Sequence, residues 1–327
     1  MKLNSSKLLT AVAVICAGAF AAPAAFAQGT FTPGTGTSTN CNVGTSGSSL
    51  ANKTCSVGTV TANMTAWGFT ATTLGSTATA GFRQGAISDW DASGVGVLSG
   101  NKETGTGGNH AFDNLTSGCG TTTGSTTVGT VTLSTNNSGC GGSIEALFLD
   151  FSATSTKVNL TSVGIGWYNN TDADLSVWAW TGTGGPNMAT QTAAGSTTTT
   201  GTTAASMAGW TLVSNLDMDM ATPQNTNGTL YSSYFLITTY FGAASTSGST
   251  SLTAGNDAFK LDSFTASLCT GTLTGGSTGG TGGAATNGNG ATCTPSTGTP
   301  EPGSLALAGV ALAGAYGIRR RKITVQQ

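Results

Sequence analysis

The sequence is poor in charged residues. Lysine, arginine, aspartate and glutamate together make up 7% of its 327 residues. Six of the 11 basic residues lie near the chain ends, so residues 28–301 hold five cations against 13 acids, a net charge of −8. Proteins that bind nucleic acid or anionic membrane surfaces carry basic patches. This balance argues against nucleic acid or an anionic membrane surface as a partner of the central part of the chain.

Histidine is nearly absent, which removes most catalytic constellations. His110 is the only one, and beside Phe112 it is interpreted as a structural, hydrogen-bonded residue. Residues 275–279 match the G-x-S-x-G pattern, but no strand precedes them and no helix follows, as a nucleophile elbow requires. We therefore expect no catalytic residue and no enzyme.

No C-x-x-C pattern occurs, and together with the single histidine this argues against zinc. Cys16 lies in the N-terminal apolar run, and six cysteines remain. An even number in an exported chain favours disulfides. They fall into sequence-local pairs, which predicts Cys41–Cys55, Cys119–Cys140 and Cys269–Cys293 among the connectivities that six cysteines allow.

The N-terminus has the three parts of a secretory signal peptide. Lys2 and Lys7 precede an apolar run over residues 8–22, and Ala25-Phe26-Ala27 forms an A-x-A cleavage site. Cleavage by signal peptidase after Ala27 makes Gln28 the first residue of the mature protein. The sequence thus predicts export across the inner membrane.

The C-terminus has a second three-part pattern. Pro300-Glu301-Pro302 interrupts the preceding structure, residues 303–318 are apolar, and Arg319, Arg320, Arg321 and Lys322 follow. As a helix, the apolar run is about 24 Å long, somewhat less than the roughly 30 Å hydrocarbon core. The cations should stay cytoplasmic, so we expect a short membrane helix that anchors the chain transiently. Hydropathy alone leaves an ordinary membrane anchor as the alternative.

This order of Pro-Glu-Pro, short apolar helix and arginine cluster resembles the PEP-CTERM sorting signal. The resemblance covers residues 299–322 and implies processing by an exosortase, a membrane transpeptidase-like enzyme of Gram-negative bacteria. Members are typically surface or extracellular-matrix proteins, often of biofilm-forming species. Between residues 109 and 268 the chain is also similar, in patches such as 110–114 and 145–151, to exosortase-dependent surface proteins. That family implies surface location and assigns no catalytic residue.

The central chain favours β-structure. Apolar residues alternate in short segments separated by Gly, Asn, Ser and Thr, which predicts an all-β, antiparallel sandwich or jelly roll. A change of parity near Thr161–Ser162 suggests a bulge. The predicted strands are 60–64, 94–98, 128–133, 145–151, 157–168, 175–180, 210–216, 231–241 and 258–267.

Composition divides the chain into five parts. We expect a signal peptide (1–27), a polar Gly/Ser/Thr-rich segment ordered only at its disulfide (28–56), the β-sandwich body (57–270), a Gly/Thr-rich tether (271–298) and the sorting signal (299–322). Within the body, residues 182–207 contain few large apolar side chains and are interpreted as a long surface loop.

Two patterns suggest ligands. Trp178 and Trp180 share one side of a strand, with Trp167 nearby in sequence; exposed, the three would form a stacking platform for sugar rings. Buried, they would simply belong to a core. Asn170, Asp172 and Asp174 offer oxygen ligands for calcium, although a polar turn between strands explains them equally well. Asp89–Asp91 and Asp217–Asp219 are weaker acid pairs, and no other cofactor is indicated.

Two functions from different classes follow. The first is a non-catalytic surface or extracellular-matrix protein, processed by signal peptidase and an exosortase-like enzyme. The alternative is a carbohydrate-binding module, with or without calcium, that reaches extracellular polysaccharide by the same route. Exposure of Trp178 and Trp180 discriminates between them.

Overall fold

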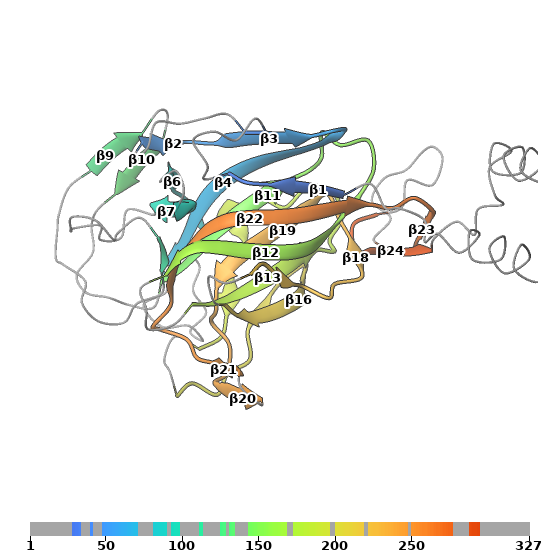
Figure 1. The fold of residues 1–327 in the computed structure, drawn as a ribbon. Helices are drawn as coiled ribbons and strands as arrows, with labels where there is room; N and C mark the ends of the chain where they lie inside the picture. The colour runs from blue at the N-terminus through green and yellow to red at the C-terminus, as the bar shows by residue number, and fades with distance from the viewer. Residues whose placement is uncertain are drawn as a thin grey trace, which may run out of the picture. The chain divides into compact units, whose positions relative to one another are not determined.

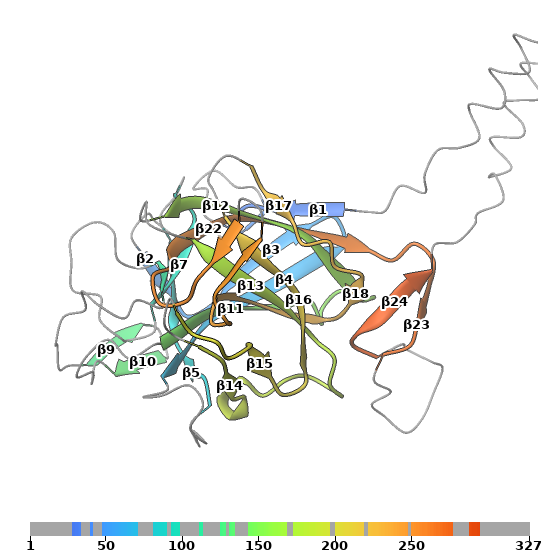
Figure 2. The same cartoon turned by 90° about the horizontal axis from the view of Figure 1, so that it is seen from below.

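The structure is a computed structural model, and nearly all of the regular structure it describes is β-strand. The described residues are 28–33, 40–41, 48–70, 81–89, 93–98, 111–113, 125–128, 131–134, 143–168, 173–196, 200–218, 222–247, 250–276 and 288–294. They belong to one compact unit spanning Ala27–Thr294. Figures 1 and 2 show this unit from two directions.

Two antiparallel sheets form the body, and we name each after a central strand. The β22 sheet runs β17-β12-β22-β7-β6-β2, with β1 and β8 also paired to β22. Its strands are β1 (Gln28–Phe31), β2 (Ser48–Leu50), β6 (Ala86–Asp89), β7 (Val95–Leu98), β8 (Phe112–Asp113), β12 (Val158–Tyr168), β17 (Gln224–Asn225) and β22 (Ala258–Leu268).

The second sheet, the β13 sheet, runs β16-β13-β19-β11-β4-β3, with β5 also paired to β4. Its strands are β3 (Lys53–Val57), β4 (Val60–Thr70), β5 (Arg83–Gln84), β11 (Ser143–Asp150), β13 (Asp174–Trp180), β16 (Trp210–Asp217) and β19 (Tyr234–Thr239). The antiparallel all-β class expected from the sequence is therefore confirmed.

Short hairpins and one turn of helix complete the described structure. β18 (Leu230–Tyr231) and β23 (Thr272–Thr274) both pair with β24 (Ala291–Thr294). The other pairs are β9 (Ser125–Val128) with β10 (Val131–Ser134), β14 (Ala193–Ala194) with β15 (Ser206–Met207), and β20 (Ser245–Ser247) with β21 (Thr250–Leu252); the 3-10 helix is η2 (Met188–Thr190). No helix in the described residues is long and apolar enough to cross a membrane.

The main core lies where side chains of both sheets meet. Leu147 and Leu149 of β11 join Val163 of β12 and Phe264 of β22 in one buried cluster. Residues on the opposite side of the β13 sheet, such as Ala146, belong to a second cluster. Side chains of successive strand residues point to opposite faces, so alternate residues of β11 contribute to the two different clusters. The β13 sheet is therefore covered on both sides.

Strand β12 contains the irregularity that its sequence predicts. Its pairing with β22 moves from Leu160↔Ala266 to Ser162↔Thr265, so Thr161 is an extra residue on one strand. This is the arrangement of a β-bulge, and it confirms the expected break near Thr161–Ser162. It lets apolar residues on both sides of the break face the same core.

The expectations for three segments, 28–56, 128–133 and 271–298, are wrong. Residues 28–56 do not depend on a disulfide alone, because β1 pairs with β22 and Phe31 stacks on Phe264 with ring centroids 4.8 Å apart. The expected strand 128–133 is the β9–β10 hairpin. The expected tether 271–298 includes β23 and β24, which belong to the folded unit. Backbone pairing orders the described parts of these segments despite their low apolar content.

Candidate functional site

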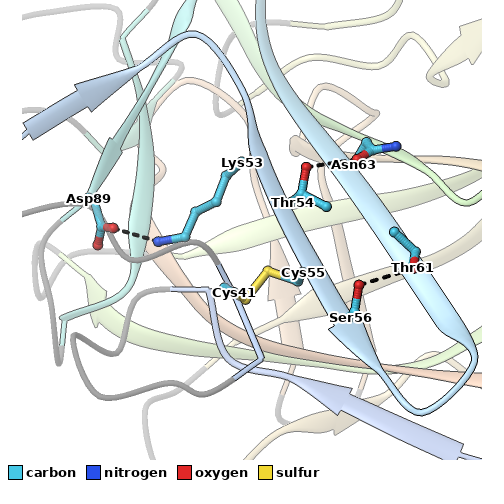
Figure 3. The surroundings of a disulfide bond; sticks show 8 residues. All are labelled: Cys41, Lys53, Thr54, Cys55, Ser56, Thr61, Asn63 and Asp89. Carbon is cyan, nitrogen blue, oxygen red and sulfur yellow. Dashed lines mark hydrogen bonds and ion pairs between the residues drawn. A yellow bond between two sulfur atoms is a disulfide. The ribbon is translucent and has the colours of Figure 1, made fainter.

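Two disulfides hold the ends of the body. Cys41 bonds to Cys55 of β3, and Cys269, directly after β22, bonds to Cys293 of β24. Both pairs match the sequence-local pairing that we expected. Figure 3 shows the first disulfide beside β3. Cys119 and Cys140 lie outside the described residues.

The C-terminal hairpin is also fixed by a buried amide. Asn289 lies just before β24, and its side-chain nitrogen donates to the carbonyl oxygen of Gly184 at 3.0 Å. Its side-chain oxygen accepts from the backbone N–H of Ser233 at 3.0 Å. These bonds join the last described strand to the start of β19 and to the chain after β13. The body is thus closed by contacts immediately before the C-terminal signal.

Trp178 and Trp180 do not form an exposed platform. They point to the outer side of β13, as the alternation predicts, but only 2% and 7% of their surfaces are accessible. Trp178 stacks on Phe241 with ring centroids 5.5 Å apart, and Trp180 meets Trp210 edge-on at 5.3 Å. Each indole nitrogen donates inside the protein, to Thr238 Oγ1 and to the carbonyl oxygen of Gly184. The platform prediction is therefore wrong for both residues.

The segment expected to be a surface loop covers them. Met188, Ala193 and Met207 from residues 182–207 belong to the same buried cluster as the two tryptophans. A Cβ atom on Gly182 of this segment would lie 2.3 Å from a ring carbon of Trp180, so only glycine lets the backbone lie this close. Small residues were interpreted as the mark of a loop, but here they allow the chain to pack directly on indole rings.

Trp167 lies in the other sheet, near the end of β12, and is half-buried. The Lys260 ammonium lies 5.0 Å from the centre of its ring, within the range of a cation–π contact. Lys260 itself is almost fully buried, and its strand β22 pairs with β12. Because Trp167 belongs to the β22 sheet and Trp178 to the β13 sheet, they do not share one binding face.

Asp150, Asp174, Asp217 and Asp257 accept hydrogen bonds from backbone N–H groups. Asp174 is fully buried and accepts from the backbone N–H of Thr253 at 2.6 Å, while its own N–H donates to Asp257 at 2.7 Å. Burial, followed by the charges of Asp174 and Asp257, raises the pKa of the Tyr240 hydroxyl. Asn170 and Asp172 lie outside the described residues. Within the described ranges no group of three metal-ligating side chains occurs, and calcium stays a prediction.

A buried ion pair escaped the sequence analysis. The Lys53 Nζ atom of β3 lies 2.5 Å from an Asp89 carboxylate oxygen of β6. In the sequence, Asp89 stands out only as a member of the acid pair Asp89–Asp91. The available signal was Lys53 itself, because it occupies a core-facing position between Leu50 and Cys55 in a body with few cations.

The remaining sequence candidates cannot be placed in the fold. The signal-cleavage residues Ala25 and Ala27, the residue His110, and the sorting residues Pro300, Glu301, Pro302, Arg319, Arg320 and Arg321 all lie outside the described ranges. Gln28, the expected mature start, is the first residue of β1 and pairs with Ser267. Cleavage at this position would therefore leave β1 complete.

Comparison with known proteins supports the C-terminal signal. Residues 299–322 match a family described as the PEP-CTERM protein-sorting motif. No curated protein and no solved structure matches the chain. The motif implies processing by an exosortase and a cell-surface or extracellular destination. The chain thus carries a PEP-CTERM sorting signal at residues 299–322, which indicates exosortase-dependent sorting of an exported protein.

Proposed function

We propose that the protein is a non-catalytic structural component of the cell surface or extracellular matrix. The observation that carries this proposal is the sorting signal at residues 299–322, attached to a disulfide-bonded β body. Consistent with this role, Asp174, Asn289 and the indole nitrogens of Trp178 and Trp180 form hydrogen bonds with other parts of the fold. Trp178 and Trp180, which suggested a carbohydrate-binding module, are buried, and the half-buried Trp167 lies in the other sheet, so no shared stacking platform supports that alternative.

The position of the signal suits removal without damage to the body. Thr294 ends β24, and about six residues later Pro300 begins the motif, a span of at most roughly 20 Å. All described strands precede the motif. An exosortase that cuts at the motif therefore releases a body whose closing strand is already held by Cys293 and Asn289.

The proposal is tested by changing only the motif. Pro300→Ala, Glu301→Ala and Pro302→Ala together preserve the apolar run and the arginines, and hence membrane insertion. We expect the wild-type protein in the cell-surface or extracellular fraction and the triple variant in the inner membrane with its tail intact. Wild type in a strain without exosortase should behave like the triple variant.

A substitution in the linker before the motif, Ser296→Ala, serves as the control and should be sorted normally. Release of the triple variant at the wild-type level would contradict exosortase sorting. If the processed wild-type protein stayed free in the medium, did not associate with surface or matrix material, and turned over a substrate, the structural role would be wrong.

A further inference from the structure

Lys53 and Asp89 connect the two sheets through their side chains. Lys53 belongs to β3 of the β13 sheet, and Asp89 ends β6 of the β22 sheet. The Lys53 Nζ atom is 2.5 Å from Asp89 Oδ2, and only 1% and 3% of the two side chains are accessible. Figure 3 shows the lysine side chain extended from β3 towards the carboxylate.

The surroundings of the pair are apolar. Lys53 is directly opposite Met64 of β4, and Cys55 lies two residues further along the same face of β3. Met64 and Cys55 are fully buried members of the main core, as is Ile87 on β6. Water is therefore excluded, and two full charges at this position carry a desolvation cost that the pair must offset.

The carboxylate is incompletely satisfied. Asp89 Oδ2 accepts from Lys53, but Oδ1 is buried and has no hydrogen-bond partner in the part of the chain that the structure describes. A buried ion pair is stable only when its remaining lone pairs are also bound. The geometry thus holds the Lys53 nitrogen against the Asp89 carboxyl group, while few hydrogen bonds stabilise the charged state of the pair.

We propose that Lys53 and Asp89 condense to form an intramolecular amide. A proton passes from the Lys53 ammonium to the Asp89 carboxylate, which leaves a neutral amine and a carboxylic acid. The nitrogen lone pair forms a bond to Cγ, the bond from Cγ to one oxygen breaks, and that oxygen leaves as water with two protons. No electrons are gained or lost overall, and no co-reactant is needed.

Position and exclusion of water favour this reaction. A nitrogen in contact with a carboxyl oxygen lies about 3–3.5 Å from its carbon, the distance of a near-attack arrangement. Holding two groups this way replaces an encounter in solution by an intramolecular step. The product amide is neutral, so the cost of two buried charges disappears. The bond would join β3 to β6, whose linked residues are 36 positions apart in sequence.

The bond lies beside a second covalent link. Cys41–Cys55 fastens the chain before β3 to a residue two positions from Lys53. Together the two links would tie the N-terminal part of the body to both sheets. An amide does not respond to reductants, so this joint would survive conditions that open the disulfide.

The test is a peptide map of the exported wild-type protein after full reduction and denaturation. An amidated lysine is not cleaved by trypsin, so residues 28–83 should remain one peptide, joined to residues 84–102. The joined species should be lighter by about 18 Da, the mass of one water, than its two parts. Fragmentation should locate the link at Lys53 and Asp89.

Lys53→Arg is the matched control, because it retains the charge and the trypsin site but the guanidinium does not condense. Its map should contain residues 28–53, 54–83 and 84–102 as separate peptides. Cyclisation of Gln28 removes about 17 Da as ammonia and affects both proteins equally. If wild type is also cleaved after residue 53 and yields unlinked peptides, the amide does not form. Should Lys53→Arg fail to accumulate, the wild-type map alone decides.

Discussion

The side-chain oxygen of Asn289 accepts a hydrogen bond from the backbone N–H of Ser233 at 3.0 Å. Asn289 is buried, two positions before β24, and Ser233 immediately precedes β19. A second bond, from Asn289 to Gly184, reaches the chain that follows β13. One side chain therefore holds the C-terminal hairpin against the β13 sheet.

Asn289→Ala should lower the free energy of unfolding by about 1–3 kcal/mol, because it leaves the buried backbone N–H of Ser233 without its acceptor. Urea denaturation of the purified protein measures this change. Thr292→Ala is the control, since Thr292 is exposed and its side-chain hydroxyl makes only exposed hydrogen bonds, to Thr274. Equal stability of the two variants would mean that the buried amide does not secure the hairpin.

Replacing Cys269 and Cys293 by serine should destabilise the body by about 3 kcal/mol, as loop-closure entropy suggests for a separation of 24 residues. The melting temperature should fall, and reducing agent should cause no further loss from this link. The Cys41→Ser, Cys55→Ser variant, with a separation of 14, should lose slightly less. An unchanged melting temperature for the Cys269 and Cys293 variant would contradict this contribution.

Trp178→Ala should cost about 3–5 kcal/mol of stability, because the ring is enclosed by Phe241 and its removal leaves a cavity. Chemical denaturation gives the value. Leu212→Ala is the comparison on β16, where the side chain is 39% exposed, and it should change stability by less than about 0.5 kcal/mol. A stable Trp178→Ala protein with lost glycan binding would restore the exposed platform.

The pH dependence of stability should reveal the ionisation of the Tyr240 hydroxyl. Burial and the nearby carboxylates of Asp174 and Asp257 raise its pKa in the folded state. Above the ordinary tyrosine pKa the unfolded chain ionises first, so the Tyr240 contribution is complete below that value and is lost as pH rises through the folded-state pKa.

Tyr240→Phe removes this alkaline contribution, along with the hydrogen bond to the carbonyl oxygen of Ala243. We therefore expect a less stable variant at neutral pH whose stability falls less steeply at alkaline pH. Denaturation curves across the alkaline range test this; parallel curves for wild type and variant would contradict it.

The sequence predicted the strands better than the segments between them. Alternation placed β11, β13 and β22 because burial of one strand face leaves a period of two. The bulge at Thr161 was visible for the same reason, as a break in that period. Residues 182–207 gave no such signal, because their packing on Trp180 depends on small residues and close backbone approach.

Among the candidate sites, too, local features could be predicted from the sequence and contacts between distant residues could not. Local cysteine spacing predicted the pairing of Cys269 with Cys293, since the loop is short. Burial of Trp178 could not be inferred, because alternation gives the face of a strand but not what covers it. The contact of Lys53 with Asp89 joins two different sheets, and a local sequence pattern does not predict a contact between residues so far apart in the chain.

The most direct measurement of the central claim is the intact mass of the protein recovered outside the cell. Export and exosortase processing predict a species that begins at Gln28 and lacks the cluster Arg319, Arg320, Arg321 and Lys322. In an exosortase-deficient strain the same protein should begin at Gln28 and retain these residues in the membrane fraction. A mature extracellular species with its complete C-terminus, in cells whose exosortase is intact, would contradict the account.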